Sequence, residues 1–137
     1  MRILILCTGN SCRSQMAHGI IRSLRSDYEV CSAGTFPAQQ VNPYAIKVMH
    51  EIGIDISSHT PTNVADYLAS DWDYVITVCG NADETCPTFD GRVAHRLHIG
   101  FEDPAEATGT EEEILSRFRL IRDQIRRRMQ LFLTEIP

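Results

Sequence analysis

The sequence has no long apolar run, and this absence limits the classes of protein that it can encode. No stretch approaches the ~18 consecutive apolar residues of a membrane-spanning helix. The apolar run at the start, Ile3 to Leu6, is also shorter than the core of a secretory signal peptide. We therefore expect a cytoplasmic protein without a membrane partner, in a compartment that keeps thiols reduced.

An excess of positive charge, internal repeats and linker segments are missing as well. The formal net charge is −5 at pH 7, which argues against nucleic acid as the main partner. A chain of 137 residues without repeats or low-complexity segments fits one compact domain, which we expect to span residues 1–137. Because no large exposed apolar stripe is evident, we expect a monomer.

Five cysteines are present, and the size of the chain frees them from a structural role. A domain of this length buries about two thirds of the surface that its unfolded chain exposes, so it needs no disulfide to fold. An odd number of cysteines in a reducing compartment indicates redox, metal or catalytic chemistry rather than a disulfide framework.

Predicted strands and helices alternate along the chain. The helix signals include Asn42 as an N-cap before Pro43, and a capping box between Thr110 and Glu113. The predicted strands are 2–6, 28–32, 73–78 and 93–99, and the predicted helices are 13–26, 42–53, 62–68 and a last one that follows residue 110. This order predicts an α/β fold with a four-stranded, doubly wound parallel sheet flanked by helices. Ligands bind such sheets at the carboxyl ends of strands, where Cys7 and Cys79 lie.

The segment from Cys7 to Ser14, Cys-Thr-Gly-Asn-Ser-Cys-Arg-Ser, joins the first strand to the first helix. Gly9 and Asn10 tolerate positive φ, so the loop can turn its backbone N–H groups inward beside a helix N-terminus and form an anion site. Arg13 adds a planar fork that matches two oxygens of a tetrahedral oxyanion. The predicted oxyanion-binding residues are Thr8, Gly9, Asn10, Ser11, Cys12, Arg13 and Ser14.

The same surroundings should act on the Cys7 thiol. Inward N–H groups, a helix N-terminus and the Arg13 charge favour the thiolate, so we expect the pKa of Cys7 to lie below ~8.5. The Ser14 hydroxyl can add a hydrogen bond to the sulfur. The alternative is a buried hydrophobic cysteine that ends a strand. A Walker loop is excluded, because the Gly-Lys-Ser/Thr ending is absent.

A cysteine, five residues and then Arg-Ser, placed after the first strand, resembles the signature loop of low-molecular-weight protein tyrosine phosphatases. The longer run Cys-Thr-Gly-Asn-Ser-Cys-Arg-Ser-Gln-Met-Ala is closer still to the arsenate reductases that share this fold. The likeness continues through residues 32–34, 42–43, 53–57 and 103–104. It implies a phosphatase-like fold in which Cys7 attacks the oxyanion held by Arg13, and in which Asp103 is the general acid. Without the resemblance, Asp103 before Pro104 would be interpreted as a turn residue, because Asp-Pro turns are common.

Cys79 and Cys86 distinguish the two families, because a reductase must supply two electrons and a phosphatase only water. Residues 79–87 resemble the redox segment of thioredoxin-coupled arsenate reductases. The resemblance implies a relay from Cys7 to Cys79 to Cys86, regenerated by reduced thioredoxin. In a helix, residues seven apart are ~10.5 Å apart along the axis, and a disulfide needs Cα atoms within about 7 Å. The two cysteines therefore cannot pair within a regular helix. Half of a zinc site, or two inert thiols, remain alternatives.

The predicted function is reduction of arsenate to arsenite, with thioredoxin as partner and no tightly bound cofactor or metal. Some reductases of this family bind potassium through acidic residues, but His18 and Thr62 stand at those positions here, so we expect no tight potassium site. Asn10 and Ser32 are then expected to brace the loop.

Two other functions stay open. One is a phosphatase that hydrolyses phosphoesters through a phosphocysteine, and the other is a non-enzymatic arsenite- or metal-binding thiol protein.

Overall fold

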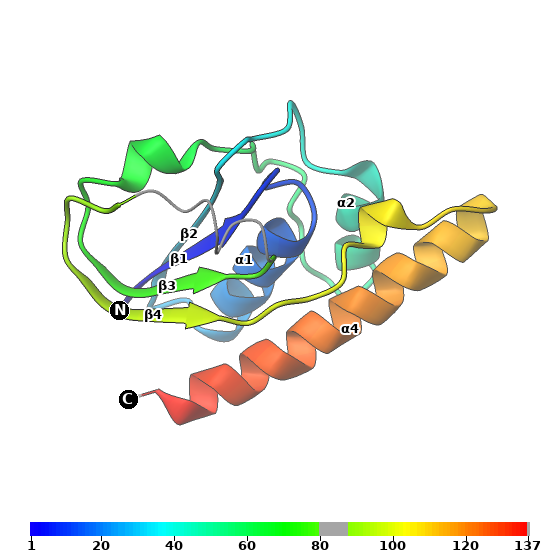
Figure 1. Ribbon diagram of the computed structural model, residues 1–137. Coiled ribbons are helices and arrows are strands. Elements are labelled where there is room, and N and C mark those ends of the chain that lie inside the picture. Colours follow the sequence, from blue (N-terminus) through cyan, green and yellow to red (C-terminus); the bar gives the residue numbers. More distant parts are fainter. Residues whose placement is uncertain (80–87, 137) are drawn as a thin grey trace.

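The computed structural model describes residues 1–79 and 88–136, and its strands form one parallel sheet in the order β2-β1-β3-β4 (Figure 1). The strands are β1 (Arg2–Cys7), β2 (Glu29–Gly34), β3 (Trp72–Thr77) and β4 (Val93–His98). The predicted four-stranded parallel sheet is therefore confirmed. Each strand end lies within two residues of its predicted place, which is the usual uncertainty of such boundaries.

The helices are α1 (Arg13–Leu24), α2 (Pro43–His50), η1 (Val64–Tyr67), η2 (Pro104–Glu106) and α4 (Glu111–Glu135). Two of the helices, α2 and α4, begin after the predicted capping residues Asn42 and Thr110. Asn42 Oδ1 accepts the N–H of Tyr44, and Thr110 and Glu113 form the reciprocal capping box. The first helix ends at Leu24, two residues before its predicted end. No helix in the described part of the chain is both long and apolar enough to cross a membrane.

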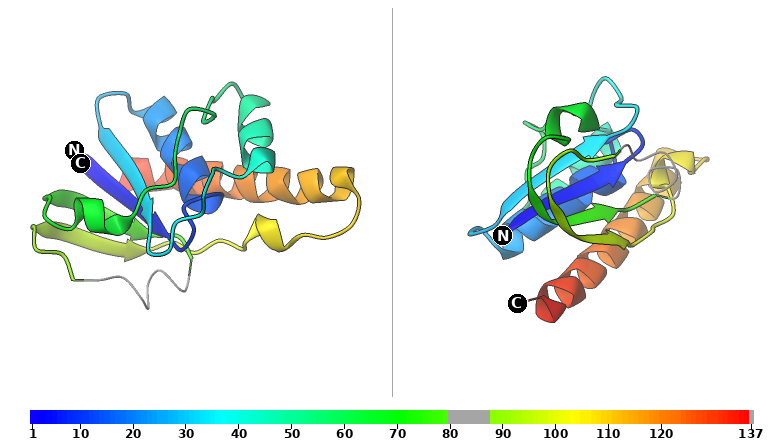
Figure 2. Two further views of the ribbon diagram at one scale, coloured as in Figure 1. Left: turned by 90° about the horizontal axis from the view of Figure 1, so that it is seen from above. Right: turned by 60° about the vertical axis from the view of Figure 1, so that its left-hand side comes forward.

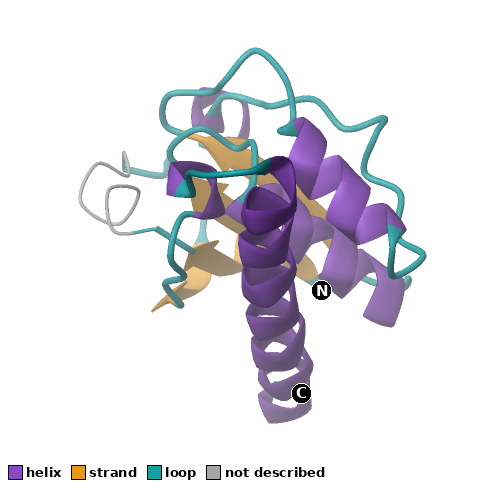
Figure 3. Ribbon diagram, turned by 90° about the vertical axis from the view of Figure 1, so that its right-hand side faces the viewer, coloured by secondary structure: helices purple, strands orange, loops and turns teal. Residues whose placement is uncertain are grey.

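The core lies between the sheet and the helices that cover it. The run from Ile3 to Leu6 is fully buried because β1 has a strand on each side and helices over the sheet. Helix α4 packs against α1 and α2, as Figures 2 and 3 show, and it buries one apolar face that includes Phe118, Ile125 and Phe132. The edge strand β4 is mostly exposed and carries polar residues instead.

The strand order brings two loops together at one end of the sheet. The chain leaves β1 for β2 on one side and later returns to β3 on the other, so the direction of winding reverses between β1 and β3. Parallel strands end at the same edge, and the space beside such a reversal is where α/β sheets bind ligands. Cys7 ends β1 and Cys79 lies just beyond β3, so both reach this space.

Candidate active site

The loop from Cys7 to Arg13 is curled because its carbonyl groups are bonded to the segment that follows β2. The carbonyls of residues 7, 8, 9 and 11 accept hydrogen bonds from the N–H groups of Thr35, Phe36, Ala38 and Asn42, at 2.8–3.2 Å. In a trans peptide the N–H points opposite to the C=O. The N–H groups of residues 8, 9, 10 and 12 therefore face the other way, toward the inside of the loop. This arrangement can form the predicted anion nest.

Two residues permit this close arrangement. Asn10 has a φ of 51° and is fully buried, which fits the tolerance of asparagine for the left-handed region. Gly34, at the end of β2, lies so near the loop that a Cβ there would be 2.4 Å from the Thr8 carbonyl oxygen. Sequence analysis identified Asn10 but missed the role of Gly34, because a glycine at a strand end gives no local sign of what packs against it.

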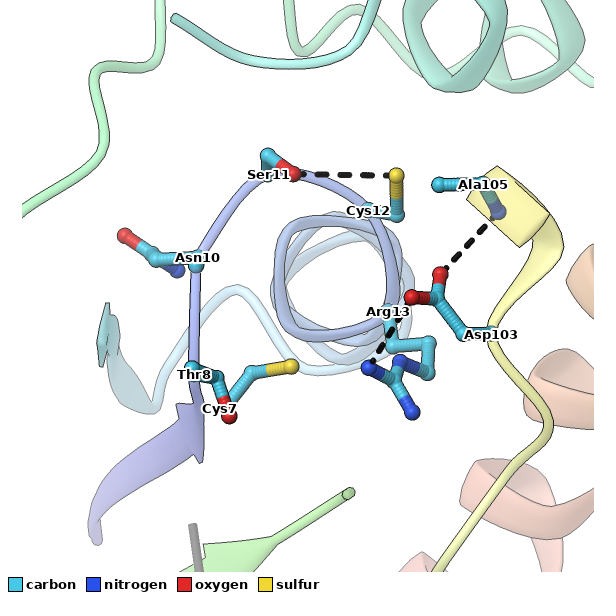
Figure 4. Close-up of a pocket in the computed structure, with 9 residues that line it drawn as sticks. Cys7, Thr8, Asn10, Ser11, Cys12, Arg13, Asp103 and Ala105 are labelled. Carbon is cyan, nitrogen blue, oxygen red and sulfur yellow. Dashed lines mark hydrogen bonds and ion pairs between the residues drawn. The ribbon is translucent and has the colours of Figure 1, made fainter. Parts of the chain in front are cut away.

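A cavity of about 270 Å³ lies against the loop. Figure 4 shows the Cys7 sulfur and the Arg13 guanidinium directed into the space between the loop and Asp103. Its lining residues are Cys7, Thr8, Gly9, Asn10, Ser11, Cys12, Arg13, Asp103 and Ala105. The structure thus brings together Cys7, Arg13, Asp103 and all but one of the predicted oxyanion-binding residues. The exception, Ser14, is fully buried, and its Oγ accepts a hydrogen bond from Asn10 Nδ2 at 2.8 Å instead of reaching Cys7.

Arg13 links the loop to the opposite side of the cavity. Its Nη1 donates to the Phe101 carbonyl at 3.1 Å, and its Nη2 lies 3.6 Å from Asp103 Oδ2. Its Nε is buried without a hydrogen-bond partner among the described residues. An oxyanion in the cavity can supply that acceptor, because a guanidinium offers two parallel N–H groups to one anion.

Asp103 is held by its own turn. Its Oδ1 accepts the N–H of Ala105 at 3.0 Å and so caps η2. Its side chain is 30% exposed, and its Oδ2 faces Arg13 at the mouth of the cavity. A carboxyl group in this position can give a proton to an oxygen that leaves a bound oxyanion.

A second thiol lies beside the first. Cys79 is buried, and its Sγ is 3.4 Å from Thr8 Oγ1. The hydrogen bond with the Cys79 side chain, followed by burial, raises the pKa of the Cys7 thiol, although the Arg13 charge and the Thr8 N–H act in the opposite direction. The predicted lowering of this pKa was wrong, because the prediction considered the loop alone and not a neighbouring buried thiol.

The other cysteines of the chain lie in different environments. Cys12 is buried in the loop, and burial raises the pKa of its thiol to about 11. Cys31 lies on β2, beside a different cavity. Cys86, to which the sequence assigns the last step of the relay, lies outside the described residues. Within the described ranges, no group of three or more His, Cys, Asp or Glu side chains is placed to hold a metal ion.

The residues at the expected cation positions have other partners. The N–H of Thr62 donates to Asn10 Oδ1 at 2.9 Å, so Asn10 does brace the loop as predicted. Ser32 Oγ lies 2.9 Å from His18 Nδ1 rather than contacting the loop. Gln15 also bonds to Asn10, and the sequence reasoning missed it. A polar residue on the buried side of α1 was the available signal.

The sequence matches the low molecular weight phosphotyrosine protein phosphatase family over residues 2–137. A protein named arsenate reductase from Halalkalibacterium halodurans is 47% identical over 131 residues, covering 95% of this chain and 93% of that protein. A solved structure described as an arsenate reductase in the phosphate binding state has a TM-score of 0.83 at 32% identity, covering 99% of this chain and 98% of the other. Vibrio vulnificus Wzb in complex with benzylphosphonate has a TM-score of 0.81 at 19% identity, covering 98% of each chain, so it shares the fold.

Proposed function

The chain belongs to the low molecular weight phosphotyrosine protein phosphatase family, and on that premise we propose that it reduces arsenate to arsenite. One observation carries the proposal: a second buried thiol, Cys79, lies against the Cys7 loop, with its Sγ 3.4 Å from Thr8 Oγ1, while Cys7 lines a cavity of about 270 Å³. Hydrolysis of a phosphoester needs one cysteine and water, whereas reduction needs a thiol that can displace the product from Cys7. The similarity to proteins named arsenate reductase supports the same choice.

Arsenate would bind with its oxygens on the inward N–H groups of the loop. Arg13 would leave the Phe101 carbonyl and turn its fork to two arsenate oxygens, which satisfies the buried Nε. The Cys7 sulfur lies at the end of β1, below this anion. Binding would therefore place the nucleophile and the electrophilic arsenic in one cavity, which is the main contribution that positioning makes to such a reaction.

The reaction would proceed by thiolate exchange. Cys7 attacks arsenic as the thiolate, after its proton has passed to an oxygen of the bound arsenate, and an arsenic hydroxyl leaves as water after taking a proton from Asp103. The Cys79 thiolate then attacks the Cys7 sulfur, the S–As bond breaks, and its electron pair stays on arsenic, which departs as arsenite. Cys86 attacks Cys79 and releases the Cys7 thiolate, so the two electrons have come from the Cys79 and Cys86 thiols, which are left as a Cys79–Cys86 disulfide.

The disulfide left after each turnover must be reduced by another thiol. We propose reduced thioredoxin as the donor, because a protein with two thiols can supply both electrons that reduce the disulfide. The enzyme then needs no resident cofactor, and the cycle requires a compartment that keeps thiols reduced, as the cytoplasm does.

The proposal is tested by following NADPH oxidation with thioredoxin, thioredoxin reductase and arsenate. The wild type should oxidise NADPH only when arsenate is present. Cys7→Ser, Cys79→Ser and Cys86→Ser should each abolish turnover, whereas Cys31→Ser, a matched change of a cysteine outside the cavity, should retain it.

Three results would contradict the proposal. Turnover that survives both Cys79→Ser and Cys86→Ser would exclude the thiol relay as the mechanism. Absence of arsenate-dependent oxidation, together with rapid hydrolysis of an aryl phosphate, would make the protein a phosphatase. Arsenite retained on purification without turnover would indicate a binding protein. A slow phosphatase side reaction is compatible with the reductase, because phosphate and arsenate share shape and charge.

A further inference from the structure

Behind the loop, on the side away from the cavity, the Asn10 side chain is the centre of a buried hydrogen-bond network. Figure 4 shows this side chain directed away from the cavity. Its Oδ1 accepts from Thr62 N at 2.9 Å and from Gln15 Nε2 at 3.1 Å, and its Nδ2 donates to Ser14 Oγ at 2.8 Å. Gln15 Nε2 also reaches the Asn10 carbonyl oxygen at 3.1 Å. The residue with the left-handed φ is therefore held from both its backbone and its side chain.

The orientation of Gln15 determines which atom of His59 carries a proton. The two acceptors on Asn10 require the NH₂ group of the Gln15 amide, so Gln15 Oε1 must face the other way. His59 Nδ1 lies 2.8 Å from that Oε1. Because a carbonyl oxygen only accepts, His59 must donate through Nδ1–H, and its Nε2 is then the unprotonated nitrogen. Nε2 is buried with no hydrogen-bond partner among the described residues.

His18 holds the His59 ring in place. The two imidazoles stack with centroids 4.6 Å apart and planes 29° apart, and His18 Nδ1 lies 2.9 Å from Ser32 Oγ. Burial, together with the neighbouring charges of His59 and Arg22, lowers the pKa of His18 to about 3. Burial and Arg22 also lower the pKa of His59, against an opposing effect of Asp55. Both rings are therefore neutral near pH 7, which agrees with a fixed donor rather than a titrating switch.

The geometry points to His59 as a positioning residue for oxyanion binding, acting through Gln15 on Asn10. Its Nδ1–H fixes the Gln15 amide, and this amide fixes the turn that directs the loop N–H groups into the cavity. His59 lies on neither the loop nor the cavity wall. Without its donor, the Gln15 amide can rotate and place an oxygen against the Asn10 carbonyl, which would loosen the turn. This inference concerns the binding step and does not require that the protein reduce arsenate.

The test compares phosphate binding by four proteins, using calorimetric titration of inorganic phosphate. His59→Leu removes the donor and should weaken binding on the order of five- to tenfold, the effect of one buried hydrogen bond. His59→Asn keeps a side-chain N–H near the position of Nδ1 and should restore most of the affinity. His50→Leu, at the exposed end of α2, is the matched control and should bind like the wild type.

Rescue by asparagine separates a positioning role from simple packing, because asparagine fills the ring volume no better than leucine. Nitrogen NMR of the wild-type imidazole supplies a second test that needs no variant, and it should find the proton of His59 on Nδ1. Wild-type affinity in His59→Leu, failure of His59→Asn to restore binding, or a proton on Nε2 would each overturn the inference. Failure of the wild type itself to bind phosphate would instead remove the oxyanion site, and the proposed function with it.

Discussion

The cavity has two walls that are built in different ways. The loop wall, residues 7–13, is held by four backbone hydrogen bonds to the segment 35–42 and by the buried Asn10 network behind it. The acid wall, residues 101–106, is held by the turn that Asp103 caps, by contacts with the Arg13 guanidinium and by an ion pair between Glu102 and Arg117 of α4. Cys7, Asn10 and Cys12 of the loop wall are buried and its other residues are partly exposed, whereas Asp103 is partly exposed and Ala105 is exposed.

This difference separates binding from proton transfer. The N–H groups of the loop wall are already oriented, so they can bind an anion without reorganising. The Asp103 side chain is 30% exposed and belongs to a short turn, so it can adjust to the oxygen that it protonates while the loop keeps its shape. Changes in the two walls should therefore have different signatures: the loop wall should affect oxyanion affinity, and the acid wall should affect the rate.

The largest effect is expected from Asp103→Asn. The amide keeps the oxygen that accepts the Ala105 N–H, but it has no proton to give, so kcat should fall by about 10²–10⁴-fold. Phosphate affinity should not decrease, because the variant also removes a negative charge beside the anion. Arsenate-dependent NADPH oxidation and phosphate titration measure the two quantities. An equal loss of affinity would show that the two walls are not independent.

Gly34→Ala should distort the backbone of the loop wall. The new Cβ would lie 2.4 Å from the Thr8 carbonyl oxygen and 3.2 Å from the backbone nitrogen of Asn10, so the backbone of the loop must move. Overpacking of this kind lowers the free energy of unfolding by about 1–3 kcal/mol, and phosphate binding should weaken. Both are measurable by urea unfolding and by titration.

Gly53→Ala is the matched control for this change. Gly53 has a φ of +79° and nothing within 4 Å of a Cβ. The variant should lose stability through backbone strain yet bind phosphate like the wild type. If Gly34→Ala bound phosphate with normal affinity, the contact between β2 and the loop would not be needed for the nest.

Much of the frame is visible in the sequence, because it depends on local signals. The apolar run of β1, the Asn42 and Thr110 caps and the curled loop with Asn10 all follow from neighbouring residues. Their positions could be predicted without knowing how the strands pair.

The features that the sequence did not reveal depend on contacts between distant segments. The sequence placed Cys79 at the same edge of the sheet as Cys7, but its contact with Thr8 depends on the pairing of β1 with β3, in which Leu6 lies opposite Thr77. His59 reaches Gln15 across 44 positions of the chain. No spacing rule predicts either contact. The wrong expectation for the pKa of Cys7 has the same origin, since the group that raises it is 72 positions away.

Cys79→Ala tests how the second thiol changes the chemistry of the loop wall. The hydrogen bond with Cys79 is the largest cause of the raised Cys7 pKa, so its removal should lower that pKa and leave the effects of Arg13 and the Thr8 N–H less opposed. Because the thiolate is the form that reacts, alkylation of Cys7 by iodoacetamide should begin at a lower pH than in the wild type. Mass spectrometry of the Cys7 peptide follows the rate, with Cys31→Ala as control. A shift to higher pH would mean that Cys79 assists ionisation of Cys7.

The smallest effect on the cavity is expected from Thr110→Ala, at the start of α4. Thr110 Oγ1 accepts the N–H of Glu113, and loss of such a cap lowers the free energy of unfolding by about 1 kcal/mol. The acid wall ends only four residues earlier, but its turn is capped by Asp103 and not by the helix. Thermal unfolding should therefore shift while the rate and the phosphate affinity stay unchanged. A fall in rate without loss of affinity would show instead that α4 positions Asp103, and that the acid wall depends on the helix as the loop wall depends on the segment 35–42.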